Sequence, residues 1–317
     1  MSDVTIVVVP RERFAVTRRS LESVYRHTEP PFALVYVDGG SPPETRRYLE
    51  AQARARGFRL LRVDRCLAPN EARNMGVGEV TTRYVVFIDN DVLVTPGWLR
   101  ALVDCAEETG AWVVGPLYCQ GDLAAQTVHM TGGHARIVER HGVRRFLEDH
   151  RFHSAPLAAV RHRLEREPCD MVEFHCLLMR TDVVSRLGPL DERLKSALEN
   201  PDLCMSVRAA GGRVYFEPAA VVTYLPPPPL APSDRPYFEL RWSDEWNRAS
   251  LRHFQDKWQL PANDPNLRRQ LKAWTWWRRR ALAAPGSMLA RARIPLRHLA
   301  GLVAARGRGA NRPRAPR

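Results

Sequence analysis

The sequence has no continuous run of about 18 or more apolar residues, the usual minimum for a membrane-spanning helix. It also lacks the hydrophobic stretch of a secretory signal behind Met1, because Asp3 and a short β-branched run at 4–9 follow directly. These two absences predict a cytoplasmic chain.

Cysteine is scarce, and its spacing shows no motif. The 317 residues contain six cysteines, and no two of them form a C-x-x-C pair. Most lie in apolar segments, so they predict reduced, buried thiols and argue against a disulfide framework or a zinc site.

Acidic residues are missing from the C-terminal end, where none follows Asp264. Residues 268–317 hold 14 of the 48 basic residues, so the remainder has 34 basic and 35 acidic residues despite a net charge of +13 for the whole chain. The basicity therefore belongs to a tail and says nothing about an active site.

The rest of the chain alternates strand-like and helix-like segments, and no internal repeat is present. Apolar or β-branched runs of strand length occupy 4–9, 32–37, 58–63, 84–88 and 111–115, and helical patterns occupy 17–27, 42–56, 70–77 and 99–109. This alternation predicts an α/β fold, with a mostly parallel sheet flanked by helices and a basic helical C-terminal extension.

The central feature is the run from Tyr84 to Ile88, which leads directly into Asp89 and Asp91. An unbroken apolar run predicts a strand buried on both faces, and ligands of parallel sheets bind beyond the carboxyl ends of the strands. Two carboxylates at this position suit Mg²⁺ or Mn²⁺. The alternative is a pair of turn-forming aspartates.

Beyond residue 119 the pattern is less regular. Gly132-Gly133 predicts a hairpin, 171–179 a strand, 182–187 and 203–210 helices, and 214–224 further strand. We expect a catalytic domain at 1–225, a Pro-rich linker with a helical segment packing on the core at 226–267, and an Arg-rich, partly disordered tail at 268–317.

Several blocks occur in an order that resembles the family 2 glycosyltransferases of the GT-A fold, over roughly residues 3 to 225. They are Val-Thr-Ile-Val-Val-Val-Pro10, Val-Asp38-Gly-Gly-Ser41, Asn70-Glu-Ala-Arg73-Asn74-Met-Gly76, Phe-Ile-Asp89-Asn90-Asp91 and Gly188-Pro-Leu-Asp191-Glu-Arg193 with Leu-Glu199-Asn200-Pro-Asp202. Each block alone is weak, but five in order at plausible spacing make the resemblance specific.

The resemblance implies an inverting transferase that takes a sugar from a nucleotide-diphosphate donor. It implies donor contacts from Pro10, Arg11, Asp38, Asn70, Arg73, Asn74, Asp89 and Asn90, and a Mn²⁺ or Mg²⁺ ion bound by Asp89 and Asp91. For two of these residues a purely structural role is the alternative: Arg73 could be an exposed helix residue, and Asp38 could be a turn residue.

Inverting transfer requires a carboxylate that removes the proton of the acceptor hydroxyl. Glu199 and Asp202 are the candidates; we favour Glu199 as the base, with Asp202 as runner-up or acceptor-orienting group. Asn200 stands where the family commonly has Asp, which leaves open which carboxylate acts.

A second departure concerns the metal. Many relatives carry a histidine after the strand equivalent to 221–222, whereas this chain has Thr223-Tyr224, so water or donor phosphate is expected to complete the site. His129, His134 and His175 are interpreted as structural or rim residues, because none forms an HxxxH or HxH pair.

The leading interpretation is an enzyme of cell-envelope polysaccharide or glycoconjugate synthesis, acting on a saccharide, lipid-linked or small-molecule acceptor. The alternatives are another GT-A-fold enzyme, either a retaining transferase or a nucleotidyltransferase, and a nucleic-acid-binding protein that uses the basic tail. We expect no nucleic-acid partner.

The tail is expected to hold the enzyme peripherally on an anionic, cytoplasmic membrane face. Trp274, Trp276 and Trp277 directly precede three arginines at 278–280, and 289–303 mixes aliphatic and basic residues with a moderate helical periodicity. The alternative is that the tryptophans pack on the core.

Overall fold

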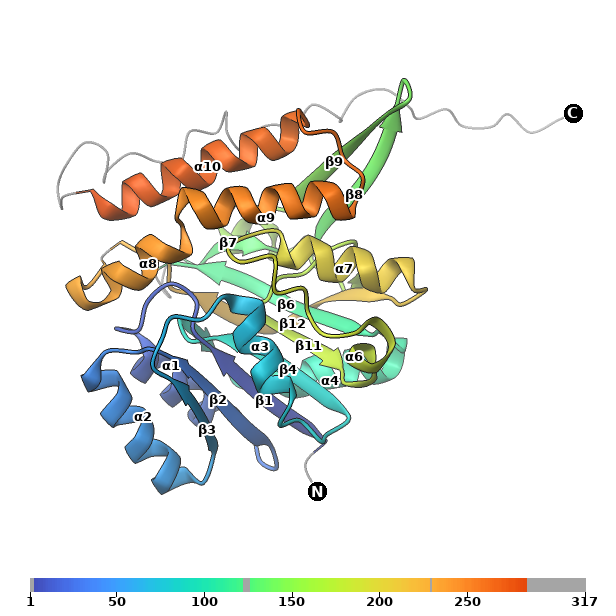
Figure 1. The fold of residues 1–317 in the computed structure, drawn as a ribbon. Coiled ribbons are helices and arrows are strands. Elements are labelled where there is room, and N and C mark those ends of the chain that lie inside the picture. The colour runs from blue at the N-terminus through green and yellow to red at the C-terminus, as the bar shows by residue number, and fades with distance from the viewer. Residues whose placement is uncertain (1–2, 122–125, 229, 284–317) are drawn as a thin grey trace, which may run out of the picture.

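The computed structural model describes residues 3–121, 126–228 and 230–283, which form an α/β fold around a large sheet (Figure 1). The first half alternates strands and helices as its hydrophobic periodicity predicts. Its elements are β1 (Val4–Val9), α1 (Thr17–His27), β2 (Ala33–Gly39), α2 (Pro43–Arg56), β3 (Arg59–Val63), α3 (Pro69–Val77), β4 (Tyr84–Asp89), β5 (Val92–Val94) and α4 (Trp98–Thr109).

The second half adds further strands to the sheet and a separate two-stranded hairpin. Its strands are β6 (Val113–Gln120), β7 (Thr127–Met130), β8 (Gly133–Arg140), β9 (Val143–His150), β10 (Glu167–Pro168), β11 (Cys176–Arg180) and β12 (Val214–Tyr224). Its α-helices are α5 (Leu157–Val160), α6 (Asp182–Leu187), α7 (Glu199–Ala209), α8 (Arg235–Arg241), α9 (Asp244–Lys257) and α10 (Pro265–Leu282).

The strand order across the sheet is β10-β12-β6-β11-β4-β1-β2-β3. The strands β4, β1, β2 and β3 are parallel, whereas β11 is antiparallel to both of its neighbours, β4 and β6. The predicted α/β class with a mostly parallel sheet is therefore confirmed.

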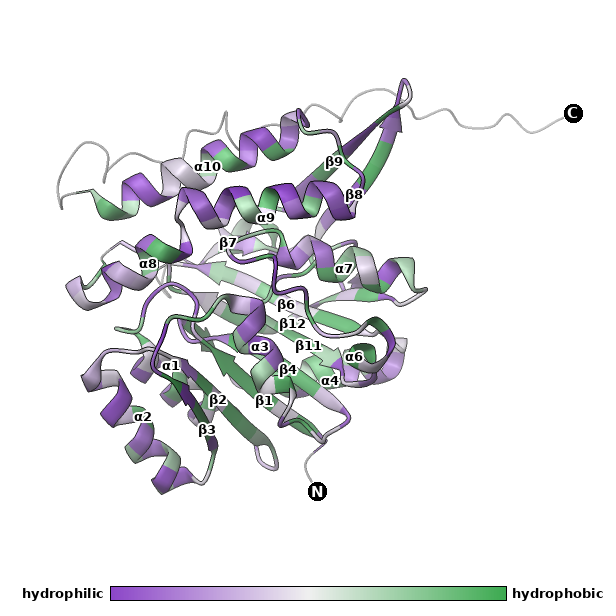
Figure 2. Ribbon diagram, viewed as in Figure 1, coloured by the Kyte–Doolittle hydropathy of each residue, from purple (hydrophilic) through white to green (hydrophobic). Residues whose placement is uncertain are grey.

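The strand β4 lies in the middle of the sheet, and all of its residues are buried. The helix α3 packs on β1 and β2, and α4 packs on β6 and β12. Figure 2 shows the consequence in the hydropathy of the chain, because the central strands are hydrophobic while α2 and α10 are mostly hydrophilic. The unbroken apolar run at 84–88 therefore corresponds to a strand that is buried on both faces, as predicted.

The hairpin turn lies at His141-Gly142 and not at Gly132-Gly133, where the sequence predicted it. Both turn residues have positive φ, 54° and 71°. Gly133 instead begins β8, where an added Cβ would lie 2.5 Å from the carbonyl oxygen of Asp149 on β9. The glycine therefore serves close strand pairing, which sequence alone does not separate from a turn.

The strand predicted for 171–179 is also shorter, since only Cys176–Arg180 pairs in the sheet. Side chains take the backbone amides before it: Glu173 N–H donates to Tyr118 Oη at 3.0 Å and Phe174 N–H to Asn200 Oδ1 at 3.0 Å. The apolar run consequently leads into β11 as an irregular segment.

The C-terminal helices α8, α9 and α10 pack together on one side of the molecule (Figure 1). Asp264 caps α10 by accepting hydrogen bonds from Asn266 N–H and Leu267 N–H, and it also accepts one from Phe146 N–H of β9. The predicted boundary between residues 267 and 268 falls inside α10, because this cap starts the helix at Pro265.

Candidate active site

Asp89 and Asp91 lie at the carboxyl edge of the sheet, as predicted. Asp89 is the last residue of β4, and Asp91 follows in the turn to β5. Both side chains are fully buried, with an exposed fraction of 0%. The sequence predicted the edge, but the complete burial follows from the loops and helices that cover it.

The carboxylate of Asp91 is unsatisfied. Neither of its oxygens has a hydrogen-bond partner among the residues that the structure describes. Burial, and then the negative charges of Asp89 and Glu12, raise the pKa of Asp91 well above its usual range. Buried oxygens without partners are costly, and hard oxygen donors are what Mg²⁺ and Mn²⁺ prefer, so these residues fit a divalent cation.

Two arginines contact the other carboxylate. Arg73 Nη2 lies 3.3 Å from Asp89 Oδ1, and Arg11 Nε lies 3.5 Å from Asp89 Oδ2. Burial by itself would raise the pKa of Asp89, but His175, Arg11 and Arg73 together lower it. Asp89 is therefore held as an anion, which separates its role from that of Asp91.

Arg73 is fully buried, so its interpretation as an exposed helix residue is wrong. Its guanidinium stacks 3.8 Å from the centre of the Phe174 ring, and Nη1 donates to Asn70 Oδ1 at 3.0 Å. Burial lowers the pKa of Arg73 to about 10, although Asp89 opposes this effect. A cation fixed in this way can face anionic ligands without rearranging.

His175 joins the two aspartates, which the sequence did not predict. Its backbone carbonyl accepts a hydrogen bond from Asp89 N–H at 3.1 Å, and its Nδ1 lies 3.1 Å from Asp89 Oδ2. One ligand atom each from Asp89, Asp91 and His175 lie within 4.8 Å of one another. Tyr224 stacks on the His175 ring, with centroids 4.1 Å apart.

Glu199 and Asp202 occupy different environments although both lie in the first turn of α7. Glu199 Oε1 accepts a hydrogen bond from Arg241 Nη2 at 3.0 Å and lies 3.6 Å from Arg11 Nη1, the arginine that also contacts Asp89. The helix begins four residues earlier than the predicted 203, which places Glu199 at its first position.

Asp202 is bound by α9 and the residue after it. It accepts hydrogen bonds from Lys257 Nζ and Trp258 Nε1, both at 2.8 Å. Burial raises its pKa, and Lys257 opposes that shift. These contacts connect α7 to α9, whereas Glu199 faces the Asp89 cluster.

The other predicted donor residues line the same edge, and most side chains hold loops. Asn90 Oδ1 accepts from Arg11 N–H at 3.0 Å, and Asp38 accepts from Ser41 N–H at 3.1 Å within its turn. Further contacts at this edge include Tyr237 Oη donating to Pro10 O at 3.2 Å, Asn70 Nδ2 donating to Asp191 O at 2.9 Å and Asn74 Nδ2 donating to Leu190 O at 2.8 Å.

Sequence reasoning missed Glu12, Arg241 and Trp242. Glu12 is buried and accepts hydrogen bonds from Tyr224 Oη at 2.7 Å and Trp242 Nε1 at 3.2 Å. Arg241 and Trp242 end α8, more than 200 positions away in the chain. A buried charge whose partner is distant in the chain leaves no local pattern. No signal in the sequence could therefore identify these contacts.

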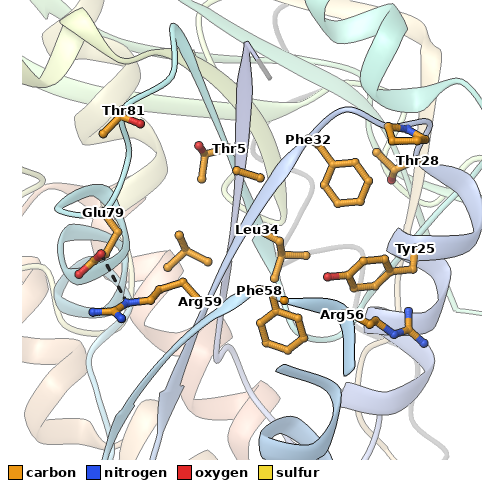
Figure 3. Close-up of a pocket in the computed structure, with 14 residues that line it drawn as sticks. Thr5, Tyr25, Thr28, Phe32, Leu34, Arg56, Phe58, Arg59, Glu79 and Thr81 are labelled. Atoms are coloured by element: carbon orange, nitrogen blue, oxygen red, sulfur yellow. Dashed lines mark ion pairs between the residues drawn. The ribbon is translucent and has the colours of Figure 1, made fainter. Parts of the chain in front are cut away.

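A separate hollow of 790 Å³ lies elsewhere on the sheet (Figure 3). Thr5 and Ala33 line it near the amino ends of β1 and β2, and Arg59 pairs with Glu79 at 3.5 Å beside it. Since the aspartates lie at the carboxyl ends of the strands, this hollow is distinct from the candidate active site.

The fold is an α/β fold with a buried acidic cluster at the carboxyl edge of its mostly parallel sheet, the edge at which ligands of such sheets bind. The sequence model described as Glycosyl transferase family 2 matches residues 5–187. The chain belongs to this family.

The chain is also similar to individual proteins. The chain is 28% identical to the uncharacterized protein y4gI of Sinorhizobium fredii over 83% of this chain and 29% of the relative. It is 26% identical to the pre-mycofactocin glycosyltransferase of Mycobacterium tuberculosis, over 70% of this chain and 42% of that protein. The chain thus spans less than half the length of these two relatives.

A third relative is closer in length. The succinoglycan biosynthesis protein ExoM of Rhizobium meliloti is 26% identical over 69% of this chain and 65% of that protein. Among solved structures, GalNAc-T7 with UDP, GalNAc and Mn²⁺ superposes with a TM-score of 0.55 at 17% identity, over 87% of this chain and 56% of that chain. This likeness supports the GT-A fold.

Proposed function

We propose that the protein transfers a sugar from a nucleotide-diphosphate sugar to an acceptor hydroxyl, with inversion at the sugar carbon and dependence on a divalent cation. The observation that carries the proposal is the buried Asp91 carboxylate, whose two oxygens have no hydrogen-bond partner in the described part of the chain. It lies beside Asp89, which two arginines hold as an anion. The arrangement suits a cation together with a diphosphate.

In this proposal Asp91 and Asp89 hold Mn²⁺ or Mg²⁺, which when bound neutralises the charge that develops on the departing diphosphate. Arg11 and Arg73 contribute fixed positive charge at the same edge. Glu199 accepts the proton of the acceptor hydroxyl, and Asp202 orients α7 through Lys257. Pro10, Asp38, Asn70, Asn74 and Asn90 shape the donor site through the loops that they hold.

The names of the relatives support a class of acceptor. Names that refer to succinoglycan biosynthesis and to a pre-mycofactocin glycosyltransferase favour a saccharide or a conjugate as acceptor. We infer that the protein acts in the synthesis of a cell-envelope polysaccharide or glycoconjugate.

A hydrolysis and transfer screen tests the proposal. The full chain is incubated with UDP-, GDP- and dTDP-sugars and Mn²⁺, and release of the nucleoside diphosphate is measured. We expect release from one nucleotide class and an anomeric configuration of the product opposite to that of the donor. Release of a sugar 1-phosphate, which leaves when the nucleotidyl group is transferred, would indicate a nucleotidyltransferase, and retained configuration would exclude direct displacement.

Cation binding should also be visible in the stability of the protein. At 100 times its dissociation constant Mg²⁺ should add about 2.7 kcal/mol to the free energy of unfolding and raise Tm by about 4 °C. Because the pKa of Asp91 is raised, protons compete with the cation as the pH falls through that raised value. The shift in Tm is therefore expected to be larger at pH 8 than at pH 5.

Differential scanning fluorimetry with and without Mg²⁺ measures this shift. Asp91→Asn should show none at either pH, while Asp256→Asn, at an exposed position of α9, should behave as the parent. An equal Mg²⁺ response in Asp91→Asn and the parent would place the ion elsewhere.

The helix α10 contains the part of the predicted membrane-binding tail that the structure describes. Trp274 and Trp277 pack with Phe238 and Trp242, so the interpretation of these two rings as core-packing residues is supported. Trp276 is partly exposed and lies 5.8 Å from the Arg280 guanidinium. The predicted aliphatic face at 289–303 lies outside the described residues.

We infer that Trp276, Arg279 and Arg280 face an anionic bilayer from the side of α10. Within the described ranges, none of the helices combines the length and hydrophobicity that crossing a bilayer requires. Attachment through an aromatic and basic surface does not need such a helix.

Replacing Arg279 and Arg280 by glutamine is expected to weaken binding to anionic vesicles about 30-fold, because each cation near an anionic leaflet contributes about 1 kcal/mol. Co-sedimentation of the full chain measures this. The matched control, Arg248→Gln with Arg252→Gln on exposed positions of α9, removes the same charge and should bind nearly as the parent. Equal weakening in both pairs would indicate a non-specific charge effect.

A further inference from the structure

A second group of candidate metal ligands lies beside the aspartates, outside the proposed sugar-transfer machinery. His129 of β7, His150 at the end of β9, and Glu173 and His175 before β11 come together near Asp89. The His129 ring is centred 5.7 Å from His150 and 5.3 Å from His175. Glu173 and His175 are more than nine-tenths buried.

The contact between His129 and Glu173 has the distance of a hydrogen bond but not its geometry. His129 Nε2 lies 2.8 Å from Glu173 Oε2, yet neither atom forms a hydrogen bond with any residue that the structure describes. Two buried polar atoms that approach so closely without bonding point toward a common third position.

The contact of the other ring nitrogen, Nδ1, indicates which nitrogen of His129 carries the proton. His129 Nδ1 lies 3.1 Å from Gln120 Oε1, and an amide oxygen can only accept. The proton therefore belongs on Nδ1, which leaves the lone pair of Nε2 directed at a carboxylate oxygen. A histidine whose second nitrogen is held in this way is the usual arrangement around a bound metal.

Two further histidine nitrogens lie near the Glu173 carboxylate. His175 Nε2 lies 4.0 Å from Glu173 Oε2. His150 Nε2 lies 3.8 Å from the other oxygen, Glu173 Oε1, and 3.2 Å from Glu148 Oε1, from which it would have to turn to become a ligand. Ligand atoms of His129, Glu173 and His175 all lie within 4.8 Å of one another. Ligands of a tetrahedral Zn²⁺ lie about 3.4 Å apart, as follows from bonds of about 2.0–2.1 Å, so small side-chain movements would complete the site.

We propose that His129, Glu173 and His175 form a binding site for a borderline divalent transition metal such as Zn²⁺, with His150 as a fourth ligand. Imidazole nitrogens favour such ions over Mg²⁺, whereas the oxygens of Asp91 favour Mg²⁺ or Mn²⁺. This inference does not depend on the sugar-transfer proposal. The proposed site connects β7, β9 and the segment before β11, and it lies next to Asp89 because His175 contacts both.

The competing interpretation is a protonated His129 that pairs with Glu173 as an ion pair. In that case the cluster would bind no metal. The two interpretations therefore differ in the stoichiometry of metal binding and in the identity of the ligands.

The test uses Co²⁺ as a spectroscopic probe for the Zn²⁺ position. The full chain is stripped with a chelator and titrated with Co²⁺, and visible absorption and calorimetry are recorded. We expect intense absorption bands of low-coordinate, nitrogen-bound Co²⁺, one equivalent per chain, displaced by Zn²⁺ and retained in Asp91→Asn. His129→Gln and Glu173→Gln should each weaken binding at least about tenfold.

His162→Gln, at an exposed position, is the matched control and should leave binding unchanged. Circular dichroism confirms folding of each variant, and either of the two ligand variants suffices if the other fails to fold. No absorption bands in the parent would overturn the proposal. Bands that vanish in Asp91→Asn but persist in both ligand variants would also overturn it, by assigning the ion to the aspartate pair.

Discussion

Asp91→Asn is expected to reduce sugar transfer by more than about 100-fold, the usual cost of removing one electrostatic partner of a developing charge. The variant keeps the shape of the side chain but removes the negative charge that a cation requires. Because burial, Asp89 and Glu12 raise the pKa of Asp91, the charged form is unfavourable in the cation-free fold. The metal-free variant should therefore be at least as stable as the parent near pH 8.

Initial rates with the donor found by the screen, together with urea unfolding, test both parts. If Asp91→Asn retains more than about a tenth of the parental rate, less than about 1.4 kcal/mol of transition-state stabilisation is missing and the metal assignment is wrong. Asp256→Asn serves again as the control for charge alone.

Glu199→Gln is expected to lower the transfer rate by about 10² to 10⁴, the range associated with general acid–base catalysis. The amide still accepts the hydrogen bond from Arg241 Nη2, so the fold and donor binding should be preserved. Single-turnover rates and nucleotide affinity separate these effects. A change in affinity with an unchanged rate would give Glu199 a binding role instead.

Asp202→Asn is the matched control on the same helix. Its partners Lys257 and Trp258 bind α9 to α7, so the variant should lose stability while transfer falls by less than in Glu199→Gln. An inactive Asp202→Asn beside an active Glu199→Gln would reverse the two roles. Full activity in both variants would place the base at another residue.

Local periodicity is sufficient to predict most of the sheet and its functional edge. The run from Tyr84 to Ile88 has no alternation, so it has to be buried on both faces, and Asp89 and Asp91 necessarily follow at its carboxyl end. The helix Thr17–His27 has the predicted bounds for the same reason, since its apolar residues repeat with helical spacing. The burial pattern and the hydrogen bonds of a single helix or strand involve residues that are close in the sequence. The sequence alone therefore shows them.

Partners across the fold were decided only by tertiary structure. His175 lies beside Asp89 because β11 enters the sheet antiparallel between β6 and β4, a pairing that joins residues 86 positions apart and has no local signature. The same physics separates Glu199 from Asp202, which lie three residues apart in the first turn of α7. Glu199 faces Arg11 and Arg241, whereas Asp202 faces Lys257 of α9. Sequence determined which residues are charged, and packing determined which charges meet.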